Sequence, residues 1–305
     1  MYYFIVNPNA RSGKGLRAWK LLERELDRKQ VPYQVFFTKY QNHASSIARE
    51  LTLKSSCRSL IVLGGDGTLN EAVNGIADLS RITLGYIPIG SSNDFARSLG
   101  LERDPLKALP RLLTPSQYIR VNIGVLCYQE KKRRFAVSAG MGFDAGVCHQ
   151  VAVSPLKLLL NRLKLGKLSY AAVAVGLLLS LTPGRMTIIL DGKQKLEFQK
   201  AYFAAAMNHP YEGGGFRFCP KADPSDDILD VVVIADLPKL KTLLLLPATF
   251  KGCHVHFKGA YVFRCRQIDI LSEKPLPVHT DGEPIVYQKH MAASLESRKL
   301  RLIKT

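Results

Sequence analysis

Acidic residues, paired cysteines and long apolar runs are all scarce in this 305-residue chain. Its 25 acidic residues face 43 lysines and arginines, and the formal charge of +18 favours an anionic partner such as nucleic acid, a phosphorylated small molecule or an anionic membrane. The six cysteines show no C-x-x-C spacing, which argues against a disulfide scaffold. The longest apolar stretch, residues 168–181, is shorter than the ~18 to 20 residues of a membrane span.

Secretion signals and internal repeats are also missing from the sequence. The chain starts MYYFIVNPNA, with no basic region leading into a long apolar stretch, so we expect a cytoplasmic protein. Hydrophobic residues make up 47% of the chain, which allows a substantial core, and at ~100–200 residues per domain the length fits two domains. The oligomeric state is left open, with a homodimer as one option.

The first 122 residues alternate short β-branched or aromatic runs with helical patterns, as in a parallel sheet built from βα units. The expected strands are residues 2–6, 33–37, 60–63 and 84–89, and the expected helices are residues 14–29, 44–53 and 68–77. This pattern predicts a doubly wound α/β domain over residues 1–122.

Residues 123–305 contain strand runs separated by turn residues. The expected strands are FAVSA, MTIIL, KLEF, AYFAAAM, ILDVVVI and AYVFRCRQIDIL. A hairpin is expected at Asp191-Gly192-Lys193, and helices are expected near residues 155–182 and 239–250. This half therefore predicts an antiparallel β-sandwich domain, whose last strand is a candidate to return to the first domain.

Glycine-rich and polar loops follow three of the expected parallel strands. In VLGGDGTLNEAVNG, residues 62–75, the glycines Gly64, Gly65 and Gly67 allow close backbone approach, and the start of the next helix suits phosphate oxygens. Asp66 beside phosphates is useful only with a divalent cation between the like charges. The alternative is a plain strand-to-helix turn in which Asp66 or Thr68 caps the helix.

A second polar cluster, Ser91 to Asp94, follows the fourth strand, and we expect it to face the same ligand because parallel strands end at one crevice. The loop after the first strand carries Lys14, which is expected to contact phosphate rather than only solvent. A P-loop is rejected because Pro8 and Gly15 stand where that motif needs glycine and a hydroxyl residue.

Together these loops resemble the diacylglycerol kinase-like lipid kinase family. The resemblance runs through GGDGTLNEAVNG (64–75), PIGSSNDFARSLG (88–100), AGMGFDA (139–145) and HTDGEP (279–284), and so spans almost the whole chain. GGDGT alone is shared with NAD kinases and phosphofructokinases, but its combination with N-E-x-x-N-G and G-S-S-N-D-F is specific. The resemblance implies a nucleotide-binding first domain and a second domain for the lipid substrate.

The resemblance implies the nucleotide contacts. ATP would contact Asn7, Pro8, Asn9, Ser12, Gly13, Thr38, Gly65, Gly67, Thr68, Leu69, Asn70, Glu71 and Ser91, and the strand-end loops add Lys14, Gly64 and Asn93. Asp66 and Asp94 would belong to an acidic network with catalytic Mg²⁺. Glu283 matches the general base that takes a proton from the lipid hydroxyl, and Asp281 of the same turn is assigned to the catalytic residues. The alternative for this segment is an ordinary β-turn.

A second metal site is implied in PKADPSDDILDV, residues 220–231. By resemblance, Asp226 would give a side-chain ligand to a structural magnesium, and Asp223 and Ile228 would give backbone oxygens. Asp227 departs from the family's usual glycine, and Asn122 stands where some members carry an aspartate. An exposed Asp-rich turn is the alternative.

Basic and apolar residues also mix in the manner of a peripheral membrane enzyme. Lys131 to Arg134 and the set Lys157, Arg162, Lys164 and Lys167 flank apolar stretches, which suits an anionic phospholipid surface. A buried helix with a solvated rim is the alternative. We expect peripheral membrane association at the site of the lipid substrate.

The sequence as a whole predicts an ATP- and Mg²⁺-dependent kinase that phosphorylates a lipid hydroxyl, with diacylglycerol as the leading substrate and phosphatidic acid as the product. One alternative is an NAD kinase-like enzyme, which shares GGDGT but not the two later motifs. The other is a nucleic-acid-binding protein, suggested by charge but lacking any RNP, helix-turn-helix or zinc-finger pattern. We therefore expect no nucleic-acid partner.

Overall fold

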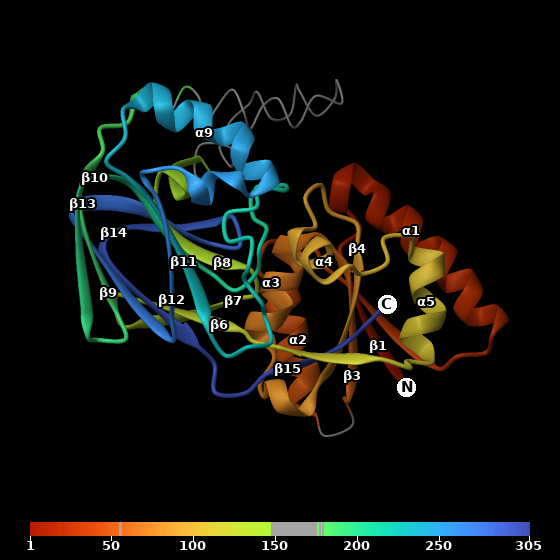
Figure 1. Ribbon diagram of the computed structural model, residues 1–305. Coiled ribbons are helices and arrows are strands. Elements are labelled where there is room, and N and C mark those ends of the chain that lie inside the picture. Colours follow the sequence, from red (N-terminus) through yellow and green to blue (C-terminus); the bar gives the residue numbers. More distant parts are fainter. Residues whose placement is uncertain (55–56, 148–175, 177, 179) are drawn as a thin grey trace.

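The computed structural model describes residues 1–54, 57–147, 176, 178 and 180–305. Within these residues the chain forms two sheets, which lie side by side in Figure 1. The first has the order β2 (Tyr33–Phe37), β1 (Tyr2–Val6), β3 (Ser59–Gly64), β4 (Thr83–Pro88), β15 (Leu300–Ile303) and β5 (Tyr118–Val121). The second contains β6 to β14 and is described below.

The first sheet is doubly wound. Strands β1 to β4 are parallel, and the chain between and after them forms α1 (Ala10–Arg28), α2 (His43–Leu53), α3 (Asp66–Gly75), η1 (Leu79–Arg81), α4 (Asp94–Leu99) and α5 (Pro105–Leu113). Alternate residues of β1 face opposite sides of the sheet. Phe4 packs with Trp19 of α1, and Ile5 packs with residues of α2 and α3.

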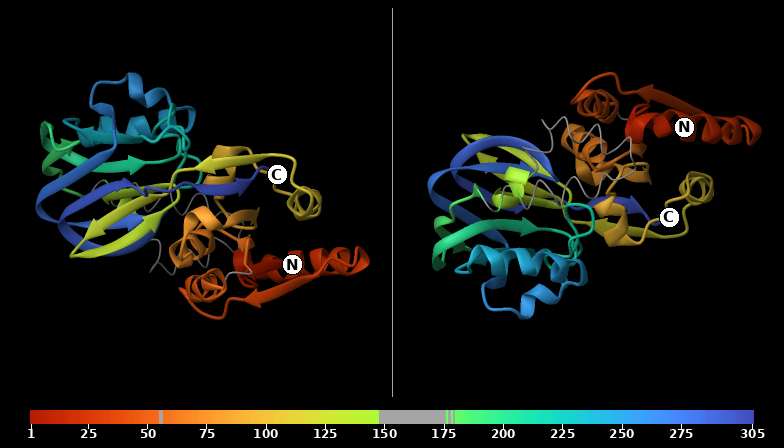
Figure 2. Two further views of the ribbon diagram at one scale, coloured as in Figure 1. Left: turned by 90° about the horizontal axis from the view of Figure 1, so that it is seen from below. Right: turned by 90° about the horizontal axis from the view of Figure 1, so that it is seen from above.

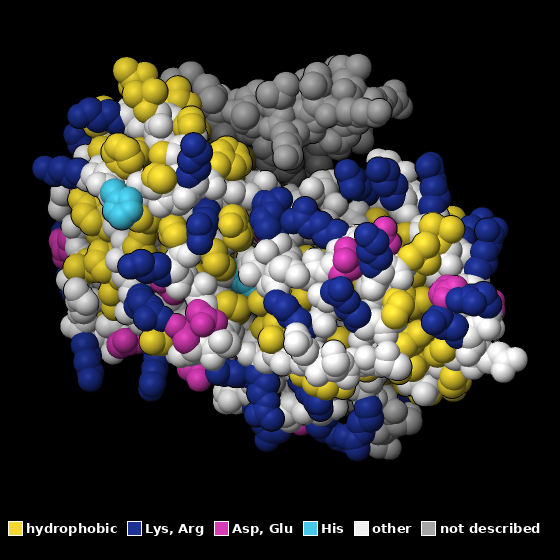
Figure 3. Space-filling view, turned by 45° about the vertical axis from the view of Figure 1, so that its right-hand side comes forward, with side chains coloured by type: hydrophobic (Ala, Val, Ile, Leu, Met, Phe, Trp, Pro, Cys, Tyr) yellow, Lys and Arg dark blue, Asp and Glu magenta, His cyan; other side chains and the backbone are white. Residues whose placement is uncertain are grey.

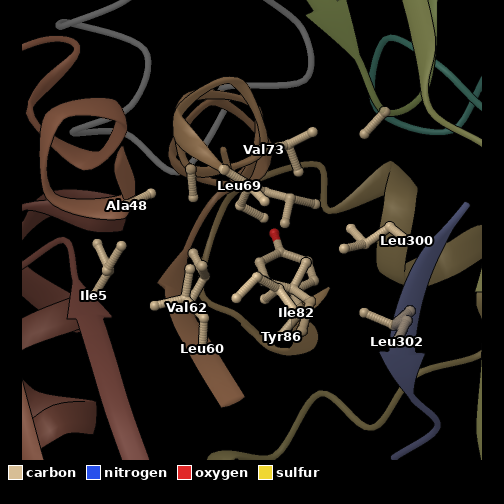
Figure 4. Packing of buried hydrophobic residues seen from close by; sticks show 14 of the residues in the cluster. Ile5, Ala48, Leu60, Val62, Leu69, Val73, Ile82, Tyr86, Leu300 and Leu302 are labelled. Carbon is tan, nitrogen blue, oxygen red and sulfur yellow. The ribbon is translucent and has the colours of Figure 1, made fainter. Parts of the chain in front are cut away.

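Figure 4 shows the apolar core beneath α3. Leu60 and Val62 of β3 point toward Leu69 and Val73 of α3, and all four side chains are at most 1% exposed. Burying each such side chain contributes about 1.5–3 kcal/mol. This packing fixes the strand-to-helix junction, and with it the glycine loop between β3 and α3.

The second sheet is antiparallel and bends over on itself. Its order is β12 (Ala260–Cys265), β11 (Leu229–Ala235), β10 (Gln194–Met207), β8 (Ser138–Gly142), β13 (Gln267–Thr280), β14 (Glu283–Leu295), β6 (Gly124–Tyr128) and β7 (Lys131–Phe135). Strand β9 (Gly184–Leu190) pairs with one half of β10 and one half of β13, while β8 pairs with the other halves. Two layers therefore enclose one apolar core.

The chain crosses between the two sheets twice. The chain leaves the first sheet after β5 and enters the second at β6, and β15 returns to lie between β4 and β5. The two further views in Figure 2 show the C-terminus beside the first sheet. Helix α9 (Lys239–Lys251) lies over the second sheet, at the top of Figure 1, and is followed by η2 (Cys253–His256).

The predicted fold class is confirmed, with local differences. The run AYVFRCRQIDIL is two strands, β12 and β13, separated at Arg266. Arg11 to Gly13, inside the α1 range, have left-handed backbone angles, so the regular helix begins at Lys14, where the sequence predicts it. The helix expected near residues 155–182 lies mainly outside the described residues. Among the residues that are described, no helix is both long and apolar enough to span a membrane.

Candidate active site

A cleft of about 590 Å³ lies where β1 to β4 end. Its lining comprises Asn7, Asn9, Ala10, Arg11, Thr38, Lys39, Tyr40, Gln41, Gly65, Gly67, Thr68, Glu71, Gly90 and Glu283. Residues from four loops of the first sheet thus meet one residue from the far end of the chain.

The loops contact each other directly. A Cβ atom added to Gly90 would lie 2.7 Å from the Cα of Gly65, so the two backbones approach too closely for a side chain at Gly90. The Asn7 amide Nδ2 donates to Thr68 Oγ1 at 3.0 Å, which joins the first loop to α3. The ends of β1, β3 and β4 therefore form one continuous surface.

Two carboxylates are crowded together beside these loops. Asp66 accepts hydrogen bonds from the backbone N–H groups of Asp94 and Phe95, at 3.3 and 3.4 Å. Burial raises the pKa of the Asp66 carboxyl to about 7, with a further contribution from the charge of Asp94. Burial also raises the pKa of Asp94. Two carboxylates that repel each other offer hard oxygen ligands, and a divalent cation such as magnesium would relieve the repulsion.

Asp94 is held in place from two further directions. Its Oδ1 is 3.0 Å from an Arg97 guanidinium nitrogen, and its Oδ2 accepts the N–H of Gly214 at 2.7 Å. Gly214 belongs to the segment after β10, so this hydrogen bond connects the second sheet to the edge of the cleft.

Glu283 follows a tight turn between β13 and β14. Asp281 and Gly282 have φ values of 50° and 78°, as expected for a two-residue hairpin turn, and Thr280 pairs with Glu283 across it. A Cβ atom on Gly67 would lie 2.6 Å from Glu283 Oε1. The predicted base is therefore in contact with the predicted phosphate loop, and the segment is both a β-turn and part of the cleft.

The Asp281 carboxylate, which the sequence assigns to the catalytic residues, joins the turn to the second sheet and to α3. It accepts hydrogen bonds from Asn70 Nδ2 at 2.7 Å and from three backbone N–H groups, at 2.7, 2.8 and 3.0 Å. Those three N–H groups belong to Ala136, Val137 and Ser138. Four donors thus surround the carboxylate, which fixes the turn, and a catalytic role for Asp281 stays a prediction.

Asn70 likewise joins the two halves of the molecule. Besides Asp281, its amide contacts the carbonyl of Arg134 and the guanidinium of Arg133. The Arg134 guanidinium also pairs with Glu296 at 2.6 Å. Two of the eight basic residues for which the sequence predicts a membrane contact thus also hold the domain junction. Lys157, Arg162, Lys164 and Lys167 lie outside the described residues.

Several predicted nucleotide contacts do not line the cleft. They are Pro8, Ser12, Gly13, Lys14, Gly64, Leu69, Asn70, Ser91 and Asn93. Leu69 is 1% exposed in the core, and Asn93 is buried with its amide donating to the Gly90 carbonyl. The sequence prediction missed Lys39, Tyr40 and Gln41. The sequence feature that could have indicated them as cleft residues is the polar and aromatic run directly after the second strand.

In the turn predicted to bind structural magnesium, two acidic side chains form ion pairs with basic side chains of the protein. Asp223 accepts from the N–H and hydroxyl of Ser225, and Asp226 pairs with the Arg264 guanidinium. Lys299 Nζ lies 2.9 Å from Asp227 Oδ2. Asp223, Asp226 and Ile228 share one turn, and metal binding there stays a prediction.

Comparisons with known proteins agree with this architecture. Residues 1–125 match the family model described as the diacylglycerol kinase catalytic domain, and residues 137–303 match the YegS C-terminal NAD kinase beta sandwich-like domain. YtlR of Bacillus subtilis, named as a lipid kinase, is 31% identical over 288 residues, covering 92% of this chain and 93% of that protein. A diacylglycerol kinase of Mycobacterium tuberculosis is 28% identical over 74% of this chain and 70% of its own length.

Solved structures show the same fold. A protein of Bacillus anthracis named as a diacylglycerol kinase superposes with a TM-score of 0.78 at 24% identity, covering 100% of this chain and 95% of that chain. The two sheets and their connection are therefore an arrangement found in experimental structures.

Proposed function

The chain belongs to the diacylglycerol kinase-like lipid kinases, and on that premise we propose that it transfers the γ-phosphoryl group of ATP to the hydroxyl of diacylglycerol, giving phosphatidic acid. Relatives named diacylglycerol kinase support the choice of lipid. The observation that supports the proposal is the contact between the Glu283 carboxylate and Gly67, because phosphoryl transfer to a hydroxyl needs a proton acceptor close to the phosphates.

The cleft suits a nucleotide triphosphate. Gly65, Gly67 and Gly90 expose backbone without side chains, and the N-terminus of α3 supplies the free N–H groups that favour phosphate. Tyr40 at the cleft lies 4.4 Å from His43 between ring centroids, which gives an aromatic surface at the side of the site. We assign the phosphates of ATP to the glycine loop and its adenine ring to the side of the cleft where Tyr40 lies.

The reaction requires one proton acceptor and accurate placement. The lipid hydroxyl oxygen attacks the γ-phosphorus, a new O–P bond forms, and the bond from the γ-phosphorus to the bridging oxygen breaks to release ADP. The hydroxyl proton passes to the Glu283 carboxylate. The Asp281 turn keeps that carboxylate at Gly67 during the transfer.

Asp66 and Asp94 would hold magnesium at this site. A bound magnesium would neutralise charge on the nucleotide phosphates. Arg97 and Gly214 hold the two carboxylate oxygens of Asp94, and the Asp94 backbone N–H donates to Asp66, so both side chains are fixed in place next to each other.

We further propose that α9 contacts the membrane that supplies the lipid. Leu240 and Leu244 are 69% and 68% exposed and stand one helical turn apart. Residues 237–268 include six lysines and arginines and no acidic residue. Figure 3 shows hydrophobic and basic side chains intermixed over one face of the molecule. Exposed leucines with nearby cations suit an anionic interface.

A phosphorylation assay tests the proposed activity. Purified protein receives γ-labelled ATP, Mg²⁺ and either diacylglycerol dispersed in vesicles or NAD. We expect labelled phosphatidic acid, and Glu283→Gln should lower turnover by about 1,000-fold, within the range for loss of a general base. Glu273→Gln, on an exposed residue of β13, is the matched control and should leave turnover unchanged. Labelling of NAD alone would overturn the proposal.

Vesicle sedimentation tests the membrane contact. Leu240→Ser with Leu244→Ser should reduce binding to vesicles that contain phosphatidylglycerol, while Leu53→Ser, at a leucine 66% exposed in α2, should not. Equal binding of both variants would contradict the role of α9.

A further inference from the structure

His279 lies directly behind the turn that carries Glu283. It is the penultimate residue of β13 and is fully buried, and the N–H of Gly282 donates to its Nδ1 at 3.2 Å. Gly282 immediately precedes Glu283. This hydrogen bond therefore fixes the backbone from which the Glu283 carboxylate projects.

The other side of the imidazole is held by two buried carboxyl groups. His279 Nε2 lies 3.0 Å from Asp144 Oδ2 and 3.2 Å from Glu212 Oε1. Asp144 follows β8 and Glu212 follows β10, so three separate segments meet at the ring. A Cβ atom on Gly140 would lie 2.6 Å from Nε2, which shows that the ring fills space left by this glycine.

The hydrogen bonds determine where the ring carries its proton. Nδ1 accepts the Gly282 N–H and so presents its lone pair there, which places the proton on Nε2, facing the carboxyl groups. Burial opposes charge on the ring, whereas the charges of Glu212 and Asp144, with a smaller contribution from Asp281, favour it and raise the pKa of His279. Burial raises the pKa of the Glu212 carboxyl. A second ring proton would have to sit on Nδ1, where the Gly282 N–H already points, so the ring keeps one proton, on Nε2, and any further proton of the cluster belongs on a carboxyl oxygen.

A metal ion is the competing occupant of this cluster. The ligand atoms of Asp144, Glu212 and His279 all lie within 4.8 Å of one another. A metal on Nε2 would need that nitrogen unprotonated, and the neutral ring would then carry its proton on Nδ1. The Gly282 N–H points at Nδ1, so the hydrogen-bond pattern favours a proton on Nε2 and disfavours the metal.

We propose that His279 is a positioning residue for phosphoryl transfer, which accepts the Gly282 N–H and thereby aims Glu283 at the Gly67 loop, with Asp144 and Glu212 orienting its ring. The inference rests on the proposed function, because it concerns the placement of the proposed base.

Two substitutions of similar size test the contacts of the two ring nitrogens one at a time. His279→Asn keeps an amide oxygen near the position of Nδ1, so it still accepts from Gly282. His279→Gln keeps an amide nitrogen near the position of Nε2, so it retains the link to Asp144 and loses the one to Gly282. Each variant buries one amide at the same place, and ATP affinity measured by calorimetry reports whether the nucleotide domain stays folded.

We expect His279→Gln to lose about 100-fold in kcat, the effect of a misplacement near 1 Å, with an unchanged KM for ATP. His279→Asn should lose no more than about tenfold, because the Gly282 contact persists. Hydrogen exchange at the Gly282 amide should accelerate in the glutamine variant only. Equal kcat values for the two variants would overturn the inference, as would stoichiometric bound metal that Asp144→Asn removes.

The two failures are distinguishable. A wild-type protein that does not phosphorylate diacylglycerol would overturn the proposed function. A wild-type protein that does so, with Glu283→Gln inactive and both His279 variants equally active, would overturn only the role of His279.

Discussion

Glu283 Oε1 occupies the space where a side chain on Gly67 would begin, 2.6 Å from the ideal Cβ position. The two residues are more than 200 positions apart in the sequence, Gly67 in α3 of the first domain and Glu283 at the start of β14 in the second sheet. Their contact joins the glycine loop to the β13–β14 turn, so the catalytic arrangement depends on how the two halves of the chain fit together.

Gly67→Ala should separate activity from stability. The added methyl group would displace the end of the flexible Glu283 side chain, and alanine is a better helix residue than glycine in α3. We expect kcat to fall by about 100-fold while the melting temperature is unchanged or higher. Gly184→Ala is the control, because no atom of the described residues, apart from its chain neighbours, lies within 4 Å of its Cβ position. A fully active Gly67→Ala enzyme would show that Glu283 is not needed at this place.

Asp281→Asn should destabilise the protein. The carboxylate accepts four hydrogen bonds. In the asparagine variant an NH2 group replaces one of the two oxygens, so it faces N–H groups that then have no acceptor. We expect the free energy of unfolding in urea to fall by about 3 kcal/mol. Asp269→Asn on the same strand, which loses only a contact to the exposed His290, should cost less than about 0.5 kcal/mol. A similar loss in both variants would contradict the role of Asp281 at the domain junction.

Acid sensitivity should come in part from His209. This side chain is fully buried, burial lowers its pKa to about 3, and neither ring nitrogen has a hydrogen-bond partner within the described part of the chain. The unfolded chain takes up the proton near pH 6.5, so this contribution is complete above that pH and is lost as the pH falls toward 3. His209→Leu should remove it.

Urea unfolding at two pH values checks this assignment. The difference in unfolding free energy between His209→Leu and wild type should shift in favour of the variant by about 2 kcal/mol between pH 7 and pH 5, since one proton contributes about 1.4 kcal/mol per pH unit. The same difference at both pH values would exclude His209 as the source.

Magnesium removal should affect turnover and leave the Asp226 turn intact. The turn already pairs Asp226 with Arg264 and Asp227 with Lys299, so it has cations of its own. We expect EDTA to abolish phosphorylation, and we expect any change of melting temperature on adding Mg²⁺ to be the same in wild type and Asp226→Asn. A stabilisation by Mg²⁺ that disappears in Asp226→Asn would instead confirm the structural metal site that the sequence predicts.

Local structure in the first domain could be predicted because it rests on short-range patterns. The β-branched and aromatic runs YYFIV and LIVL identified β1 and β3, and the helical spacing after them identified α1 and α3. Where the parallel strands end follows from the same pattern, so Gly65, Gly67 and Thr68 were correctly expected at one edge. Glu283 was found through its resemblance to a known motif, because nothing in the local pattern indicates which residue it meets.

Long-range contacts set the limit of the sequence prediction. Asn70 looks like a nucleotide contact in GGDGTLN, yet its amide faces the second domain because of how β7 lies against α3. The meeting of Asp144, Glu212 and His279 depends on the registers of β8, β10 and β13, which a single sequence does not reveal. The sequence predicts a membrane contact for Arg133 and Arg134 from charge alone, which does not reveal that they also contact Asn70 and Glu296 at the domain junction.

The return of β15 to the first sheet has a consequence for biosynthesis. Residues 300–303 fill the gap between β4 and β5, so the nucleotide half remains one strand short until the ribosome has made almost the whole chain. The nascent amino-terminal half therefore exposes unpaired strand edges throughout translation. A premature stop codon directly after Lys299 would spare every residue of the cleft and still leave that half unfinished.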